Sequence, residues 1–211
     1  SKAAAEIAIA SFRRSFFNPD RADLRVGIAS ARAGNVIGGG DWATDRIVPD
    51  CIRALSNCEV IKLRNPRASR PWQHVLDPLG GYLLLGRLLR ETLQLMAGEA
   101  RIKALRRNAS AFNFGPTLES NRSVRELVEQ GLNHWSGQWE DASDPTAPHE
   151  AVLLNLATDK AFHTLGWYPR WDFSETVART ISWYRQTAEG ADPAALTRQD
   201  IDAYVQATGK P

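Results

Sequence analysis

The chain has 211 residues, of which 43% are hydrophobic and 24% are charged, and its formal net charge is +2. This composition is ordinary for a globular protein and excludes wholesale disorder. Two cysteines are too few for a disulfide framework or a four-thiolate zinc site. No apolar run approaches the roughly 20 residues that span a bilayer, and the pattern of a signal peptide is absent. We therefore expect a soluble protein of the cytoplasm with no membrane partner.

Arginine makes up 21 of the 26 basic residues. Its planar fork of donors suits phosphate groups, although a compositional bias of the genome explains such an excess equally well. The arginines are dispersed along the chain and not massed on one helix, which disfavours a nucleic-acid partner.

The chain opens on a predicted helix over residues 1–17, with apolar residues at helical spacing on one face. A domain rarely opens inside a helix, so we expect further residues to precede Ser1. The elements predicted next are a strand over 24–30, a helix over 45–56, a strand over 60–63, a helix over 77–96, a strand over 111–114, and helices over 123–133, 158–165, 174–188 and 197–207. The segments 64–72 and 136–148 are predicted as loops. Alternating helices and short strands indicate an α/β protein whose C-terminal half is rich in helices.

Several stretches, taken in order, resemble one enzyme family. Ser1-Lys2-Ala3-Ala4-Ala5-Glu6 is similar to the end of the Tyr-x-x-x-Lys motif of short-chain dehydrogenases/reductases, whose Tyr would precede Ser1. The segments that resemble extended members acting on nucleotide sugars are 31–50, 67–79, 112–116 and 165–171. The strings Gly-Asn-Val-Ile-Gly-Gly-Gly-Asp-Trp (34–42), Arg-Pro-Trp-Gln-His-Val (70–75) and His149-Glu150-Ala151 are most similar to the CDP-glucose 4,6-dehydratases.

This resemblance covers nearly the whole chain and implies an incomplete Rossmann-like fold of the extended short-chain dehydrogenase/reductase type. Residues 1–35 would be the C-terminal remnant of the NAD-binding domain. Residues 36–211 would form mainly the helix-rich substrate-binding domain, with segments over about 70–114 returning to the Rossmann domain. The chain would thus correspond to the C-terminal portion of such an enzyme.

The resemblance also assigns charged residues of the site. Lys2 would be the catalytic lysine, which bonds the nicotinamide ribose and lowers the pKa of the motif tyrosine. Arg70 matches the arginine that binds the diphosphate, and Arg46 matches a basic position facing the same phosphates. The alternative for Arg70 is an ordinary surface salt bridge.

Four uncharged positions match substrate-binding positions of the family. Asn35 and Asn113 would fix sugar or phosphate oxygens, although asparagine is also common in turns. Ile61 and Leu63 match the short strand that packs on the nucleobase, and a strand that simply fills the core explains them nearly as well.

His149 and Glu150 are weaker candidates for lining the substrate pocket. As a pair they suggest acid–base chemistry or a metal ligand, but one His and one Glu do not make a metal site. We therefore expect no metal.

In this family NAD oxidises the sugar at C4, water is lost across C5 and C6, and the hydride returns to C6. The resemblance thus implies an NAD-dependent lyase that converts CDP-glucose to CDP-4-dehydro-6-deoxyglucose, a precursor of surface polysaccharides. The glycine-rich dinucleotide fingerprint is not found in residues 1–211, so we expect this polypeptide to be inactive alone. The alternatives are a stand-alone nucleotide-sugar-binding module that needs a partner chain, and another NAD-dependent epimerase or dehydratase of nucleotide sugars. The family also implies a homodimer through the helix over residues 1–17.

Overall fold

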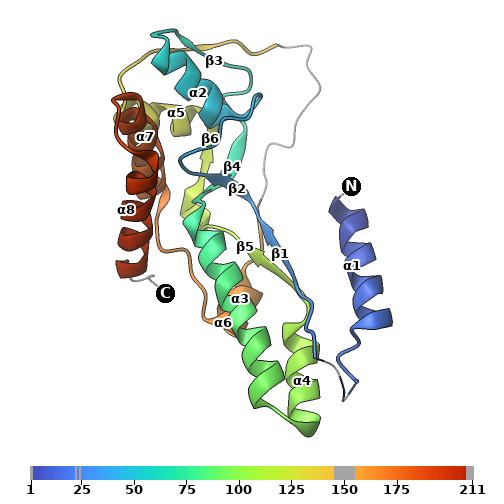
Figure 1. The fold of residues 1–211 in the computed structure, drawn as a ribbon. Helices are drawn as coiled ribbons and strands as arrows, with labels where there is room; N and C mark the ends of the chain where they lie inside the picture. The colour runs from blue at the N-terminus through green and yellow to red at the C-terminus, as the bar shows by residue number, and fades with distance from the viewer. Residues whose placement is uncertain (1, 22, 24, 145–154, 208–211) are drawn as a thin grey trace. The chain divides into compact units, whose positions relative to one another are not determined.

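The structure, a computed structural model, describes residues 2–21, 23, 25–144 and 155–207 (Figure 1). The chain divides into two compact units. The first unit consists of residues 1–33, 79–114 and 157–167, and the second of residues 34–78, 115–156 and 168–211. Among the described residues no helix is long and apolar enough to cross a membrane.

The first unit is built on two parallel strands, β1 (Ser30–Ala33) and β5 (Ala111–Phe114). Its helices are α1 (Lys2–Phe16), α4 (Gly98–Asn108), α6 (Asp159–Leu165) and the part of α3 (Leu76–Leu95) from residue 79 onward. Its core is one apolar cluster of buried residues, namely Leu85, Phe112, Phe114, Ala161 and Trp167. None of the residues of α1 is buried.

The second unit contains a three-stranded sheet and a strand pair. In the sheet, β4 (Ser69–His74) lies between β2 (Asn35–Ile37), to which it is parallel, and β6 (Asn121–Ser123), to which it is antiparallel. The pair joins β3 (Ile61–Leu63) to β7 (Trp139–Asp141) in parallel. The helices are α2 (Ile47–Ser56), α5 (Val124–Leu132), α7 (Phe173–Ala188) and α8 (Pro193–Gln206), with a 3₁₀ turn η1 (Leu118–Ser120).

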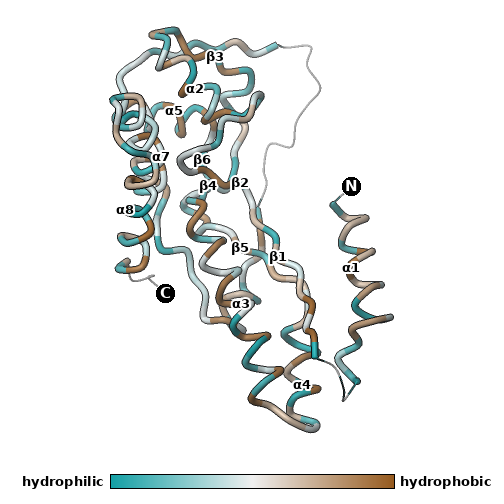
Figure 2. The backbone as a smooth tube through the Cα atoms, viewed as in Figure 1, coloured by the Kyte–Doolittle hydropathy of each residue, from teal (hydrophilic) through white to brown (hydrophobic). Residues whose placement is uncertain are grey.

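The core of the second unit forms because α2, α5 and α7 each carry an apolar stripe, visible as brown segments in Figure 2. One buried cluster gathers Ile37 and Trp72 from the sheet with Val177, Ile181 and Tyr184 from α7. A second cluster joins α2, α5 and β3.

The helix boundaries follow local signals in the sequence. Ser123 opens α5 with a complete capping box, in which its hydroxyl accepts from the Glu126 amide and the Glu126 side chain accepts from the Ser123 amide. Gly166 closes α6 in the left-handed conformation, with φ at 63°. These signals agree with the helices predicted over 123–133 and 158–165, and the structure confirms both helices.

Other boundaries were predicted wrongly. The apolar residues around Val26 suggested a strand over 24–30, but the first strand starts only at Ser30. The segment 64–72, rich in Arg and Pro, was expected to be a loop, yet β4 occupies residues 69–74. Pairing with β2 on one side and β6 on the other outweighs the poor strand propensity of this segment. Helix α4 was missed, and β7 lies inside the predicted loop over 136–148.

Candidate functional site

The residues that the sequence singled out are divided between the two units. Lys2 and Asn113 belong to the first unit. The second unit holds the other five described candidates, which are Asn35, Arg46, Ile61, Leu63 and Arg70. His149 and Glu150 lie outside the described residues.

The three-stranded sheet positions two of these candidates on one face. Asn35 begins β2 and lies opposite Trp72 of β4, and Arg70 is two residues before Trp72 on the same strand. Side chains of alternate residues share a face, so Asn35, Arg70 and Trp72 project to the same side. Both Asn35 and Arg70 are half-buried, and Nη1 of Arg70 donates to the Ser69 carbonyl at 2.8 Å. The arrangement offers an amide and a guanidinium to a polar ligand.

Arg46 lies at the N-terminal boundary of α2. Its Nη1 is 3.1 Å from Oδ2 of Asp41, and its side chain is 65% exposed. An ion pair this exposed contributes little to stability, so the guanidinium can exchange its partner for another anion.

Ile61 and Leu63 point into the core between α2, α5 and β3. They are 3% and 0% exposed, while Lys62 between them faces solvent. Their packing accounts for the strand, and a contact with a nucleobase stays a prediction.

The glycine-rich loop before α2, residues 38–41, packs against α7 and is hydrogen-bonded to it. A Cβ at Gly39 would lie 2.1 Å from the Trp183 ring, so only glycine permits this approach. Next along the loop, the Asp41 amide donates to the Tyr184 hydroxyl at 2.8 Å, and that hydroxyl donates to the Asp41 carbonyl at 2.7 Å. Burial raises the pKa of Tyr184 to about 12, so the phenol stays protonated and the link persists at neutral pH. The glycines therefore serve packing in this loop.

In the first unit, Lys2 is an exposed residue at the start of α1. Asn113 on β5 donates its Nδ2 to the Ala157 carbonyl at 3.0 Å, while its Oδ1 is buried without a hydrogen-bond partner among the described residues. Lys160 of α6 holds the start of the same strand, with Nζ 2.8 Å from Oγ of Ser110 and 3.0 Å from the Ala111 carbonyl. Burial is the main cause that lowers the pKa of Lys160.

Asp77, at the start of α3, is a buried carboxylate that the sequence suggested only as a helix cap. Its Oδ1 accepts from the Arg170 amide at 2.7 Å and from the Tyr204 hydroxyl at 3.1 Å. Burial raises its pKa to about 6, against the opposing effect of these hydrogen bonds. Asp77 is 0% exposed, so it anchors α8 and does not face a substrate. Its partners come from distant parts of the chain, and no local pattern announces them.

His74, at the end of β4, is also buried. Its Nδ1 accepts from the Leu76 amide at 3.3 Å, and its ring meets Trp171 edge-on with the centroids 4.6 Å apart. Burial, and next the charge of Arg179, lower the pKa of His74 to about 3. The imidazole is therefore neutral and structural. Among the described residues no group of three His, Cys, Asp or Glu side chains is placed to hold a metal.

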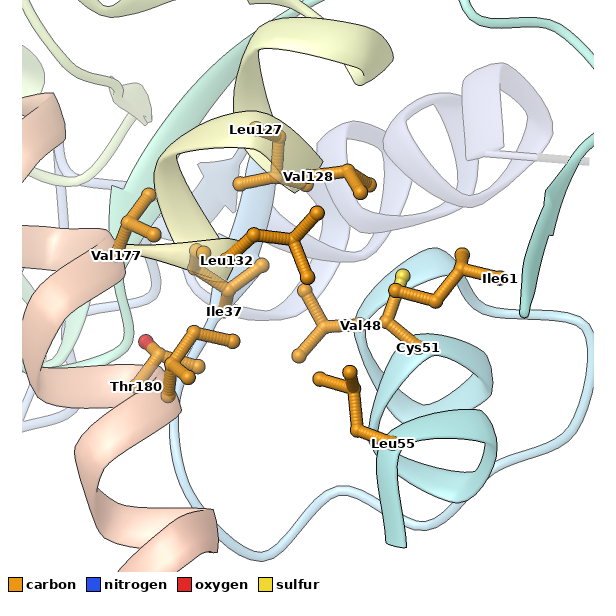
Figure 3. A pocket seen from close by; sticks show the side chains of 12 residues that line it. Ile37, Val48, Cys51, Leu55, Ile61, Leu127, Val128, Leu132, Val177 and Thr180 are labelled. Atoms are coloured by element: carbon orange, nitrogen blue, oxygen red, sulfur yellow. The ribbon is translucent and has the colours of Figure 1, made fainter. Parts of the chain in front are cut away.

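An apolar cavity lies between α2, α5 and α7 (Figure 3). Its lining includes Cys51 and Thr180, and its volume is about 20 Å³, which is close to the space of a single water. Burial raises the pKa of Cys51 to about 12 and keeps this thiol unreactive. The cavity is a gap in the core and is too small for a nucleotide.

A larger crevice of about 260 Å³ opens between α7 and α8. Its cation, Arg179, is paired with Glu175 at 2.6 Å and with Asp200 at 2.9 Å. Because Arg179 is already paired with two carboxylates, the crevice does not offer this guanidinium to an anionic ligand such as a phosphate.

Comparison with known proteins finds two similar dehydratases. The chain is 40% identical over 214 aligned residues to the CDP-glucose 4,6-dehydratase of Salmonella typhimurium, and the alignment covers 99% of this chain and 55% of that protein. The chain is homologous to part of a nucleotide-sugar 4,6-dehydratase. It is also 37% identical over 81 residues to a dTDP-glucose 4,6-dehydratase of Streptomyces antibioticus, which covers 37% of this chain and 23% of that protein. No protein-family model matches the chain.

Solved structures show the fold. A dTDP-glucose 4,6-dehydratase from Streptomyces venezuelae matches with a TM-score of 0.65 at 19% identity, covering 91% of this chain and 52% of that one. A UDP-glucose 4-epimerase from Thermotoga maritima matches with a TM-score of 0.64 at 17% identity, covering 88% of this chain and 52% of that one. The chain therefore has part of the Rossmann-like fold shared by these dehydratases and epimerases, and it spans about half the length of these relatives.

NAD is bound in the Streptomyces venezuelae structure and in a Bacillus anthracis dTDP-glucose 4,6-dehydratase of the same fold. The residues of the present chain do not form such a site by themselves. The sequence contains no Gly-x-Gly-x-x-Gly, and the backbone around Gly39 is packed against Trp183.

Proposed function

We propose that the chain carries the nucleotide-sugar-binding part of a CDP-glucose 4,6-dehydratase of the cytoplasm. The observation that carries the proposal is the 40% identity to the Salmonella enzyme over 99% of the chain. For the whole enzyme we propose the net loss of water across C5 and C6 of the sugar, which gives CDP-4-dehydro-6-deoxyglucose.

The residues of the second unit act on the nucleotide end of the substrate. Arg70 binds the diphosphate, because a guanidinium fork gives charge-assisted, bidentate hydrogen bonds to phosphate oxygens. Asn35, on the same face of the sheet, holds a neighbouring oxygen. Arg46 leaves Asp41 and turns to the phosphates, since its exposed ion pair costs little to break.

In the first unit, Lys2 would take the place of the motif lysine, and Asn113 would offer its buried Oδ1 to a donor on the ligand. His149 and Glu150 remain candidates for the pocket wall. Ile61 and Leu63 would support the nucleobase from the core side of β3.

Binding of nucleotides tests this function. In calorimetric titrations of the 211-residue chain with CDP, UDP, GDP and dTDP, we expect CDP to bind most tightly. Replacing Arg70 with Gln should weaken CDP about tenfold or more, the effect of losing a hydrogen-bonded charge. Equal affinity for the four nucleotides would overturn the assignment to cytidine, and absence of binding would overturn the proposed function.

Turnover is the second test. We propose that this polypeptide alone does not convert CDP-glucose, because its residues supply no dinucleotide-binding fingerprint. Incubation with CDP-glucose and NAD should give no 4-keto product by mass spectrometry. Appearance of that product would contradict the proposal.

Two alternative functions have support of their own. The likeness to a UDP-glucose 4-epimerase, at a TM-score of 0.64, fits another enzyme of nucleotide sugars, and a preference for UDP in the titrations would favour it. A stand-alone binding module fits the compact second unit, and turnover that appears only after a separate partner chain is added would favour this alternative.

We further propose that α1 forms a homodimer. Its apolar side chains Phe12 and Phe16 are exposed and lie one helical turn apart, with their rings 5.0 Å from each other. An exposed apolar stripe of this kind marks a surface that another protein covers. Sedimentation should show a dimer that dissociates in the double variant Phe12→Ser/Phe16→Ser. A monomer at all concentrations would contradict it.

A further inference from the structure

Trp42 directly follows the glycine-rich loop and differs from the other tryptophans in its exposure. Its exposed fraction is 53%, whereas the other six tryptophans are buried or half-buried. Leaving a large apolar ring in water is unfavourable. Tryptophan is also enriched among the surface residues that contribute most to binding. The exposure of Trp42 therefore points to contact with a ligand.

The backbone around Trp42 is held in place on both sides. Arg53 of α2 donates from Nη1 to the Trp42 carbonyl at 3.2 Å and from Nη2 to the Ala43 carbonyl at 3.4 Å. On the other side, the amide and the carbonyl of Asp41 are both hydrogen-bonded to the Tyr184 hydroxyl. A ligand that contacts this segment finds it already ordered, so binding does not bear the entropy cost of fixing it.

The indole ring of Trp42 keeps a face open to solvent. It meets the Tyr184 ring edge to face, with the centroids 5.1 Å apart and the planes at 82°. Such a contact covers at most one face of the indole, in agreement with the 53% exposure of the residue. A flat aromatic ring can stack on the open face, and every nucleobase has a π-face suited to this contact.

Arg46 places a positive charge near this ring. Arg46 follows Trp42 by four residues, and its exposed ion pair is with Asp41, the residue immediately before Trp42. The guanidinium therefore lies beside the segment that carries the indole. In a nucleotide one ribose separates the base from the phosphates, so a single ligand can stack on the ring and pair with Arg46 through its phosphates.

We propose that Trp42 is the platform on which the nucleobase of the nucleotide sugar stacks. This proposal rests on the proposed function, because its ligand is a nucleotide. Ile61 and Leu63 are 3% and 0% exposed, so direct contact with the base falls to Trp42 and not to these two residues. Stacking tolerates any base. Trp42 thus supplies affinity for the nucleoside, and the selection of cytosine requires hydrogen-bonding groups elsewhere.

Calorimetric titration with CDP and with inorganic pyrophosphate tests the platform. We expect Trp42→Leu to weaken CDP about tenfold and to leave pyrophosphate unchanged, because pyrophosphate has no base. Trp42→Phe keeps a flat ring and should restore most of the CDP affinity. The matched control is Leu118→Ala, which removes another exposed apolar side chain of the second unit, 70% exposed, and should bind both ligands like the wild type.

Two results of these titrations would overturn the platform. Equal CDP affinity in Trp42→Leu and the wild type would do so and leave the proposed function standing. An equal weakening of CDP and pyrophosphate in Trp42→Leu would show that the side chain only supports its loop. If the wild type does not bind CDP, the proposed function fails and the platform fails with it.

Tryptophan fluorescence gives a readout that a purely structural role would not move. A base stacked on Trp42 should quench part of the wild-type emission as CDP saturates, and pyrophosphate should not. Trp42→Phe should bind CDP without this quenching. The same quenching in Trp42→Phe would place the base against another tryptophan and contradict the proposal.

Discussion

The two units differ in how fully they bury their own helices. Helix α7 of the second unit buries six residues, from Thr176 to Tyr184, whereas α1 of the first unit buries none. Among the described residues, the sheet of the first unit has two parallel strands, whereas parallel sheets are normally covered on both faces and contain more strands. The second unit therefore buries its helices with its own residues, while α1 of the first unit leaves apolar side chains such as Phe12 and Phe16 exposed.

The largest expected effect is on the free energy of unfolding, and it should differ sharply between a substitution in the second unit and one in the first. Leu63→Ala empties a fully buried position in the second unit, so it should lower the free energy of unfolding by about 2–5 kcal/mol. Ile7→Ala on α1, where Ile7 is 71% exposed, should change it by less than about 0.5 kcal/mol in the monomer. Urea unfolding followed by tryptophan fluorescence measures both. Comparable losses would mean that α1 is packed as tightly as the core.

Lowering the pH should destabilise the second unit because His74 becomes protonated. The pKa of this residue is lowered to about 3 in the folded chain, below its ordinary value, so its contribution is complete above about pH 6.5 and is lost as the pH falls toward 3. At pH 4 the loss is about 3 kcal/mol. His74→Phe keeps a ring against Trp171 and should remove this part of the pH dependence in urea unfolding.

Asp77 has the opposite effect on how stability depends on pH. Its pKa is raised to about 6, so its contribution favours folding at low pH and fades as the pH rises from about 4 to 6. The quantity to compare is therefore the difference in free energy of unfolding between His74→Phe and the wild type, because the contribution of Asp77 is common to both. If this difference is the same at pH 7 and at pH 4, the prediction is wrong.

The smallest expected effect is an increase in the free energy of unfolding. Gly131 lies in α5 beside the apolar cavity, and a Cβ there would lie 3.5 and 3.6 Å from two carbons of Ile181, which is ordinary contact. Gly131→Ala should therefore raise the free energy of unfolding by about 0.5–1 kcal/mol, the usual advantage of alanine in a helix. Gly39→Ala should do the opposite, because its Cβ would collide with Trp183. In thermal melting, the melting temperature of Gly131→Ala should be higher than that of the wild type and the melting temperature of Gly39→Ala should be lower.

The sequence predicted those parts of the fold whose signals are local. The helices over 123–133 and 158–165 were predicted because the capping box at Ser123 and the glycine that closes α6 are signals of only a few residues. β4 was missed because its strand character comes from pairing with β2 and β6, which no window of the sequence contains.

The candidate site shows the same limit. Arg70 was found through a motif that surrounds it, whereas its position on the same face of a sheet as Asn35 follows only from the pairing of β2 with β4. Asp77 was noticed as the start of a helix, but its partners follow 93 and 127 residues later. Long-range pairing is the information that a single sequence does not provide.

The bond from Tyr204 to Asp77 also bears on how the chain matures on the ribosome. A nascent chain that ends before residue 204 lacks the hydroxyl that donates to Asp77 in the folded protein, and burying a carboxyl without its hydrogen-bond donor is costly. The second unit thus reaches its final form only when its last helix emerges. Premature termination within α8 should yield a product that proteases clear and that chaperones retain.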